Sequence, residues 1–243
     1  MITLRPDQLT AVHELRTALR DHQSVLLQAA CGFGKTVVSA YMADGAHRKR
    51  RRVIFAVHRR ELARQTALTF DKFDIPYGYI MAGMPANPFA PVQIASADTL
   101  RRRMDTIKGC DLFIPDEAHL WGDATRAEII ETVMADGSRV VPLTATPMRG
   151  DGKPMRRIAH KMVCGPPVAD LIRNGNLAPY KPYAPVRPDL SKLHTRMGEY
   201  VQAGVEELMG RPAVARDALR YYRQFAEGKR MIGYCVSRER GRQ

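Results

Sequence analysis

The 243-residue sequence lacks several features, and each absence excludes a class of protein. Its four cysteines are far apart and form no C-x-x-C pair, which argues against a zinc ribbon or a disulfide scaffold and predicts reduced thiols. No window approaches the roughly 18 apolar residues of a membrane span. The first residues, MITLRPDQLT, lack the basic stretch and apolar run of a signal peptide. We therefore predict no membrane partner and a cytoplasmic location.

The sequence has fewer acidic residues than basic residues, and it has few aromatic residues. Lys and Arg number 38 against 25 Asp and Glu, a net charge of +13, and aromatic residues make up 7% of the chain. The positive excess favours a polyphosphate or nucleic-acid partner, whereas the few aromatics argue against base stacking as the main contact. With 45% apolar residues the chain can bury a core, which excludes disorder throughout. The length suits about one domain and a fragment of a second.

Short apolar runs alternate with helical patterns as far as about residue 145. The runs predicted as strands are 25–30, 53–57, 92–96, 112–115 and 139–143, and helical spacing follows or precedes them at 4–19, from 35, at 59–73, after 96 and around 129–134. This order predicts an α/β fold with a mostly parallel, doubly wound sheet that places ligands at the carboxyl ends of its strands. Pro115 and Pro142 lie inside two of these runs and predict local irregularity.

The pattern changes after about residue 165. Prolines become frequent, at positions 166, 167, 179, 182, 185 and 188, and predict a linker. We predict a first domain over residues 1–165, a linker over 166–195 and the start of a second domain over 196–243. In that last part the spacing predicts helices at 199–209 and 213–227 and a strand at 231–236.

Residues 29–36 read AACGFGKT and match the phosphate-binding loop G-x-x-x-x-G-K-[ST], except that Ala29 replaces the first glycine. Glycines there allow backbone N–H groups to point at phosphates, and the following helix presents its positive end. Lys35 would reach the β- and γ-phosphates, and Thr36 would ligate Mg²⁺. The alternative is a chance glycine-lysine loop. The predicted nucleotide-binding residues of this loop are Ala30, Cys31, Gly32, Phe33, Gly34, Lys35 and Thr36.

Asp116-Glu117-Ala118-His119 follows the apolar run at 112–115, so two carboxylates lie where a buried strand ends. Asp116 can hold Mg²⁺, and Glu117 can orient and deprotonate an attacking water. Taken alone, such a pair is more often a helix cap, and a lone histidine such as His119 is more often a satisfied interior residue. The lysine loop upstream favours the catalytic interpretation. No second cluster of metal-ligating residues supports a nuclease.

In order, the segments LRPDQ, AACGFGKT, AVHRREL, SADTL, DEAH and TATP resemble the motifs of the first RecA-like domain of superfamily 2 DEAD/DEAH-type helicases. The resemblance covers most of residues 1–240 and is closest to the group of bacterial and phage ATP-dependent helicases and restriction translocases. It implies a RecA-like P-loop NTPase that uses ATP and Mg²⁺, with an incomplete second domain. A loop that begins with alanine is common in that superfamily.

The resemblance also implies roles for individual residues. Arg5 and Gln8 match the motif that recognises adenine, and Thr144 and Thr146 match the motif that couples hydrolysis to movement. Without the resemblance, Gln8 could be a solvated first-turn residue, and the two threonines could be ordinary strand-end hydroxyls. The catalytic set is Lys35, Asp116, Glu117 and His119. The nucleic-acid-binding set is His58, Arg59, Arg60, Ser96, Thr99 and Arg101, whose arginines follow strands at the ligand edge.

Together these features predict an ATP-dependent nucleic-acid helicase or translocase. DNA is the favoured track, RNA is possible, and restriction, repair or phage replication proteins are possible partners. One alternative is a restriction or nuclease motor that moves without unwinding, and another is a nucleotide-switched binding remnant. The motif that carries an arginine finger does not occur in these residues, so we expect weak ATP binding and slow hydrolysis by this chain alone. The basic run at 48–52 is interpreted as a solvated turn.

Overall fold

The computed structural model describes residues 3–148, 155–182, 191, 193–196, 199–209 and 212–234. It forms two units, Met1–Pro179 and Tyr180–Gln243, and each is described by itself. The domain division predicted at residues 165 and 195 stays a prediction.

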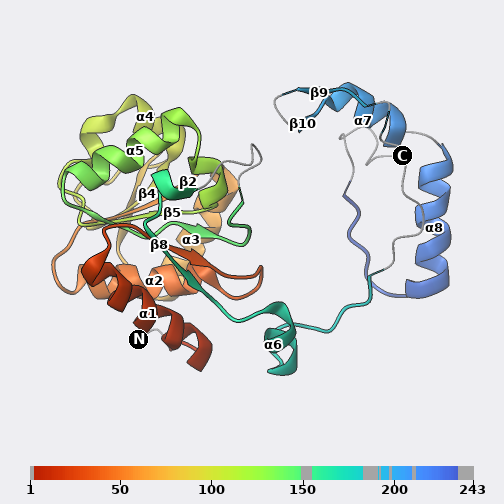
Figure 1. The fold of residues 1–243 in the computed structure, drawn as a ribbon, viewed down its shortest axis with the longest axis horizontal. Helices are drawn as coiled ribbons and strands as arrows, with labels where there is room; N and C mark the ends of the chain where they lie inside the picture. The colour runs from red at the N-terminus through yellow and green to blue at the C-terminus, as the bar shows by residue number, and fades with distance from the viewer. Residues whose placement is uncertain are drawn as a thin grey trace. The chain divides into compact units, whose positions relative to one another are not determined.

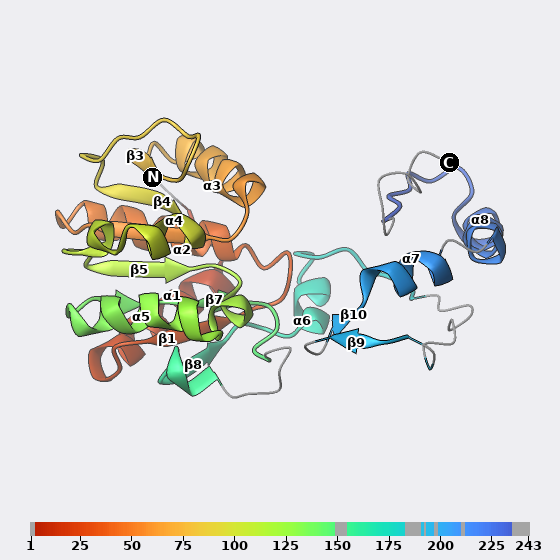
Figure 2. The same ribbon diagram turned by 90° about the horizontal axis from the view of Figure 1, so that it is seen from above.

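A parallel sheet forms the centre of the first unit. Its strands are β1 (Val25–Gln28), β2 (Val53–Val57), β3 (Tyr77–Ile80), β4 (Val92–Ser96), β5 (Leu112–Pro115), β6 (Arg139–Val140), β7 (Leu143–Thr144) and β8 (Lys161–Cys164). They lie in the orders β3-β4-β2-β5-β6 and β7-β1-β8, and a parallel bridge between Ser24 and Val140 joins the two groups. Figure 2 shows β3 and β4 at one side of this arrangement and β1 and β8 at the other. The predicted doubly wound α/β class is confirmed.

The break between β6 and β7 has a local cause. Pro142 has no backbone N–H, so the run predicted as one strand at 139–143 divides around Val141 and Pro142. The carbonyl of Pro142 still accepts a hydrogen bond from Leu27 N at 2.8 Å, and Val141 N donates to Phe113 O at 2.8 Å. The chain therefore stays in the sheet while the ladder is interrupted, as the proline predicts.

Helices cover both faces of the sheet. They are α1 (Pro6–Asp21), α2 (Lys35–His47), α3 (Arg60–Lys72), α4 (Ala97–Arg102), α5 (Ala124–Ala135) and α6 (Val168–Arg173), with 3-10 turns at Met104–Ile107, Ala118–Trp121 and Met155–Arg157. Along β2, Val53 and Phe55 face a core with α1, α2 and α3, whereas Ile54 and Ala56 face a second core with α4 and α5. Figure 1 shows α4 and α5 on one side of the sheet and α1 and α2 on the other.

In the first helix, two residues differ in burial from what the apolar spacing over residues 4–19 implies. It begins at Pro6, as predicted, and buries Val12 and Leu15. Leu9, however, is 48% exposed, and Gln8 beside it is 3% exposed. The alternative of a solvated Gln8 is therefore wrong, because this amide faces the loop after β1. Elements β3, β8 and α6 are also present although the sequence patterns did not indicate them.

The second unit contains two short strands and two helices among its described residues. Strand β9 (Thr195–Arg196) pairs antiparallel with β10 (Glu199–Tyr200), and α7 (Gln202–Met209) and α8 (Pro212–Ala226) follow. Both predicted helices are thus present. Of the strand predicted at 231–236, residues 231–234 lie in no regular element, and 235 and 236 lie outside the described residues. Within the described ranges, no helix has the length and apolar character needed to cross a membrane.

Candidate functional site

The loop between β1 and α2 has the backbone geometry of an anion cradle. Gly32 and Gly34 have φ angles of +81° and +92°, which glycine adopts without the strain that a Cβ would add. Helix α2 begins directly after them at Lys35, so its first N–H groups, which have no partner inside a helix, point out of its end toward the loop. The predicted loop residues therefore lie together at the carboxyl edge of the sheet.

The Lys35 side chain forms hydrogen bonds with backbone carbonyls at the start of the same loop. Its Nζ donates to Ala29 O at 2.9 Å and Ala30 O at 3.4 Å. Thr36 follows it in the first turn of α2 and is partly exposed, and its carbonyl accepts a hydrogen bond from Ser39 Oγ. The ammonium group is thus held over the cradle by weak carbonyl partners that an anion could replace.

The same loop is held by Arg5, directly before α1, and by Gln8, in the first turn of α1. Gln8 Nε2 and Arg5 Nη2 both donate to Phe33 O at 2.8 Å, and the Arg5 guanidinium lies 5.8 Å from the centre of the Phe33 ring. The Phe33 side chain is fully buried. An added Cβ at Gly34 would lie 2.7 Å from Gln8 Nε2. The structure therefore places Arg5 and Gln8 against the loop, and their recognition of adenine stays a prediction.

Leu177 is a residue of this site that the motifs do not reveal. It lies just after α6, in the segment predicted as a linker, and packs against the core of the first unit. A Cβ added at Gly32 would collide with the Leu177 side chain, and one added at Gly165 would lie 3.0 Å from the Ala29 Cβ. Gly165 and Leu177 thus pack against the loop. The only sequence signal is a pair of leucines, Leu171 and Leu177, that flank a glycine turn.

The acidic pair follows β5 at the same edge. Glu117 adopts a left-handed backbone with φ of +52°, which is unusual for a residue with a side chain. Its N–H donates to Asp116 Oδ1 at 3.0 Å, and Trp121 Nε1 donates to Asp116 O at 2.8 Å. Burial raises the pKa of the Asp116 carboxyl, while the positive charge of Lys35 acts in the opposite direction. The lysine and the carboxylate therefore belong to one electrostatic environment.

His119 connects the acidic pair to the end of β7. Its Nδ1 lies 3.2 Å from Thr144 Oγ1 and 3.4 Å from Glu117 Oε2. The Thr144 hydroxyl donates to Thr146 O at 3.0 Å and accepts from Thr146 N at 3.1 Å. The two threonines are thus part of a continuous polar network with the histidine, so His119 is neither isolated nor simply buried.

The residues predicted to contact nucleic acid also lie at this edge, but their side chains differ in the hydrogen bonds that they form within the chain. Arg60 donates to Ala82 O at 3.0 Å. Ser96 caps α4, because its Oγ accepts from Thr99 N at 3.1 Å and donates to Thr99 Oγ1 at 2.8 Å. Arg59 and Arg101 are exposed. The structure thus gives Ser96 and Thr99 a local role of their own.

His58 lies at the end of β2 and is half-buried. Burial lowers its pKa below the ordinary value, and the Glu117 carboxylate opposes that shift. Its Nδ1 is buried and finds no hydrogen-bond partner in the described part of the chain. His58 therefore lies between the predicted nucleic-acid segment and the acidic pair.

The donor set suits one hard cation bound together with phosphates. Thr36 offers a hydroxyl and Asp116 a carboxylate, and Mg²⁺ is commonly held by one or two such oxygens plus substrate phosphates. Across the described ranges, no group of three or more His, Cys, Asp or Glu side chains could form a metal site without a substrate. The residues present therefore fit a Mg²⁺-triphosphate better than a metal bound by protein alone.

Comparisons with known proteins agree with this geometry. Residues 1–149 match a family model described as type III restriction enzyme, res subunit. A 51.5 kDa protein of a Lactococcus phage (isolate 7-9) is 31% identical over 88% of this chain and 44% of its own length. A protein of Invertebrate iridescent virus 3 whose name describes it as helicase 109L is 28% identical over 78% of this chain and 58% of its own length. The chain therefore spans about half the length of these relatives.

A solved structure supports the fold. The UvsW helicase of bacteriophage T4 superposes with a TM-score of 0.54 and 16% sequence identity, over 66% of this chain and 59% of that chain. At this identity the likeness concerns the arrangement of strands and helices.

Proposed function

The chain belongs to the type III restriction enzyme res subunit family, with a superfamily 2 helicase-type RecA-like domain, and on that premise we propose that it hydrolyses ATP to move along DNA. The family implies nucleotide binding, and the site described above is the proposed place. The observation that carries the proposal is the common position of the glycine cradle, Lys35 and the half-buried Asp116 at one sheet edge. RNA remains the alternative track.

Each residue at this edge has a proposed task. Thr36 and Asp116 would hold Mg²⁺, which supplies charge neutralisation at the phosphates. Lys35 would exchange its bonds to Ala29 O and Ala30 O for phosphate oxygens, which neutralise its charge better than carbonyls do. Glu117 would orient a water and accept its proton. Arg5 and Gln8, which already hold Phe33 O, would recognise the adenine.

We propose that neighbouring residues at the same edge couple ATP hydrolysis to the binding of nucleic acid. His119, Thr144 and Thr146 form the polar network that joins β5 to β7. Contact with backbone phosphates is assigned to His58, Arg59, Arg60, Ser96, Thr99 and Arg101. Such contacts would be independent of sequence, since phosphates carry no base information. We further propose that turnover by these 243 residues alone is slow, because no arginine-finger motif occurs among them.

The family description names a restriction enzyme, and on that basis we propose a second candidate, a motor that translocates on duplex DNA without separating its strands. Strand-displacement and triplex-displacement assays distinguish the two: a helicase releases a paired strand, whereas a translocase releases only the third strand of a triplex.

The proposed function is tested by Glu117→Gln. We expect this variant to bind ATP as the parent does, because the amide keeps the size of the carboxylate. In a longer chain that includes a complete second RecA-like domain, nucleic-acid-stimulated phosphate release should fall by about 10²-fold or more, since a positioned base contributes about 10² to 10⁴. Equal phosphate release by parent and variant would contradict the proposal and favour a binding module without catalysis.

A further inference from the structure

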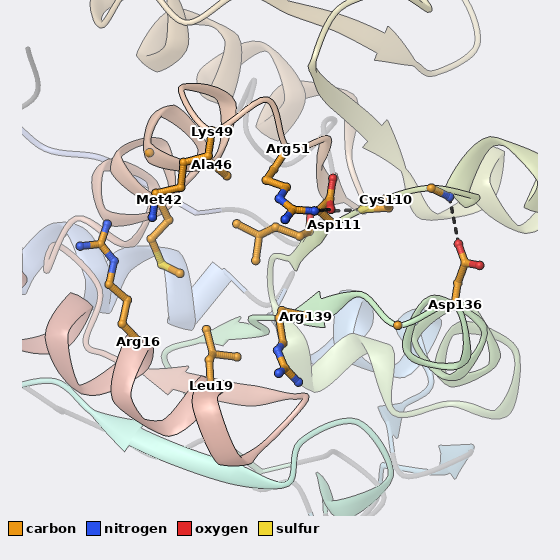
Figure 3. A pocket seen from close by; sticks show the side chains of 14 residues that line it. Arg16, Leu19, Met42, Ala46, Lys49, Arg51, Cys110, Asp111, Asp136 and Arg139 are labelled. Carbon is orange, nitrogen blue, oxygen red and sulfur yellow. Dashed lines mark hydrogen bonds and ion pairs between the residues drawn. The ribbon is translucent and has the colours of Figure 1, made fainter.

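We propose that the amino-terminal edge of the sheet carries a docking pocket for an acidic peptide segment with an apolar side chain, contributed by a protein partner. The pocket has a volume of about 500 Å³ and is formed by the last turns of α1 and α2 and the segments that precede β2, β5 and β6. Figure 3 shows its labelled side chains. Because all strands of this sheet are parallel, the pocket lies at the edge opposite the candidate ATP site.

Four cations line the pocket, and among the described residues only one of them is paired with a carboxylate. Arg51 pairs with Asp111 at 2.8 Å. Arg16, Lys49 and Arg139 are exposed and form no ion pair with any carboxylate in the part of the chain that the structure describes. Arg16 has one other contact, its guanidinium lying 5.5 Å from the centre of the Tyr41 ring. Three positive charges therefore remain available to an anionic ligand.

The two carboxylates of the pocket, Asp111 and Asp136, offset only part of the charge of the four cations, and the lining keeps a net charge of +2. Asp111 is engaged with Arg51 and also accepts a hydrogen bond from Arg52 N at 2.8 Å. Asp136 accepts a hydrogen bond from Gly109 N at 2.9 Å. The run at 48–52 is thus only partly the solvated turn expected from the sequence. Arg51 and Arg52 form hydrogen bonds at this edge, whereas Lys49 is exposed and has no ion pair within the described ranges.

Apolar side chains form the floor between the cations. Met42 and Leu112 are 7% and 8% exposed, and Leu19 and Ala46 are half-buried beside them. Figure 3 shows Leu19 and Met42 lying between Arg16 and Arg139. An apolar side chain inserted there would leave water at little steric cost, since methionine adapts its shape to different partners.

The lining favours a peptide over a nucleic acid. None of the described residues that line the pocket is aromatic, so a nucleobase would find no stacking platform among them. A phosphate placed on Leu19 and Met42 would lose hydration without gaining a donor there. A peptide that alternates acidic and apolar side chains satisfies both parts of the pocket, with carboxylates at the guanidinium groups and the apolar group on the floor. Such a partner could bind without blocking the opposite edge.

The test is selection of short random peptides displayed on phage against the whole chain. We expect the selected peptides to be enriched in Asp or Glu next to Leu, Met or Phe, and a synthetic copy to bind in the micromolar range. The double variant Arg16→Glu/Arg139→Glu should weaken that peptide by at least about tenfold, the effect of about 1.4 kcal/mol. The matched control Arg64→Glu/Lys72→Glu makes the same charge change on α3, outside the pocket, and should leave the affinity within about twofold of the parent.

Three results would overturn the proposal. The first is a set of selected peptides without enrichment in acidic residues. The second is an equal loss of peptide affinity in the α3 control variant. The third is a single-stranded oligonucleotide that competes with the peptide and whose binding is weakened as much by Arg16→Glu/Arg139→Glu. The last result would assign the pocket to phosphates. If the reversed variant does not fold, Arg16→Gln/Arg139→Gln removes both charges while keeping polar side chains, and it should still weaken the peptide severalfold. ATP affinity, measured in parallel, should not change, so failure here is separate from failure of the proposed ATP site.

Discussion

The two edges of the same sheet are built in opposite ways. At the carboxyl edge, polar side chains are held by backbone partners: Lys35 by Ala29 O, and Gln8 by Phe33 O. At the amino edge, Arg16 and Arg139 are exposed and lack ionic partners in the described ranges. The difference indicates that the first edge is preorganised for one small ligand, as catalysis requires, whereas the second can adapt to a flexible partner.

The largest expected effect is confined to the carboxyl edge. Lys35→Ala removes the ammonium that covers the loop. We expect ATP affinity to fall by about 10²-fold, because a hydrogen bond to a charged group typically contributes about 1.5–3 kcal/mol. Titration of a fluorescent ATP analogue measures it. The control Arg16→Ala should leave that affinity unchanged. A similar loss for both variants would remove the distinction between the edges.

A glycine comparison sharpens the same contrast. Gly34 and Gly137 both have positive φ, at the carboxyl and amino edges respectively, but only Gly34 has a neighbour that an added Cβ would meet, Gln8 Nε2. We expect Gly137→Ala to lower the free energy of unfolding by about 1–2 kcal/mol through backbone strain alone. Gly34→Ala should lower it by about 1 kcal/mol more, since the Gln8 hydrogen bond is also disturbed.

Urea unfolding of the two glycine variants provides the readout, and ATP titration adds a second. Gly34→Ala should weaken ATP binding, whereas Gly137→Ala should not. Equal unfolding free energies, together with equal ATP affinities, would show that the loop tolerates a side chain and is not a phosphate cradle.

The smallest expected effect is the protection of one thiol from labelling when Mg²⁺-ATP binds, and its measurement needs no mutation. Burial raises the pKa of the Cys110 thiol to about 12, so at about pH 8 this thiol stays protonated in the folded chain and should not react. Cys31, in the loop, and Cys164 are exposed and should both react. Mg²⁺-ATP should slow labelling of Cys31 and leave Cys164 unchanged, as followed by peptide mass spectrometry. Protection of Cys164 alone would place the nucleotide elsewhere.

The linear order of motifs was sufficient to predict the carboxyl edge. Strands β2, β4 and β5 coincide with the apolar runs at 53–57, 92–96 and 112–115, because a buried parallel strand needs continuous apolar side chains. Since every such strand ends at one edge, the motifs that follow them had to meet there. The proline at 142 likewise predicted the interruption between β6 and β7.

Features that depend on packing between distant segments could not be predicted in this way. The left-handed backbone of Glu117 depends on the surroundings of one residue, and no local pattern encodes it. Contact between Leu177 and Gly32 joins residues far apart in sequence, in a segment whose prolines suggested a linker. The amino-edge pocket gathers Arg16, Lys49 and Arg139 from three segments that carry no shared motif.

The central claim is that the glycine cradle and Asp116 hold the same Mg²⁺-triphosphate. The most direct test is ATP affinity measured with Mg²⁺ and with EDTA, for the parent and for Asp116→Asn. We predict that Mg²⁺ strengthens binding by about tenfold in the parent, worth about 1.4 kcal/mol, and that the variant loses this gain while keeping its affinity in EDTA. An undiminished Mg²⁺ effect in Asp116→Asn would contradict the account.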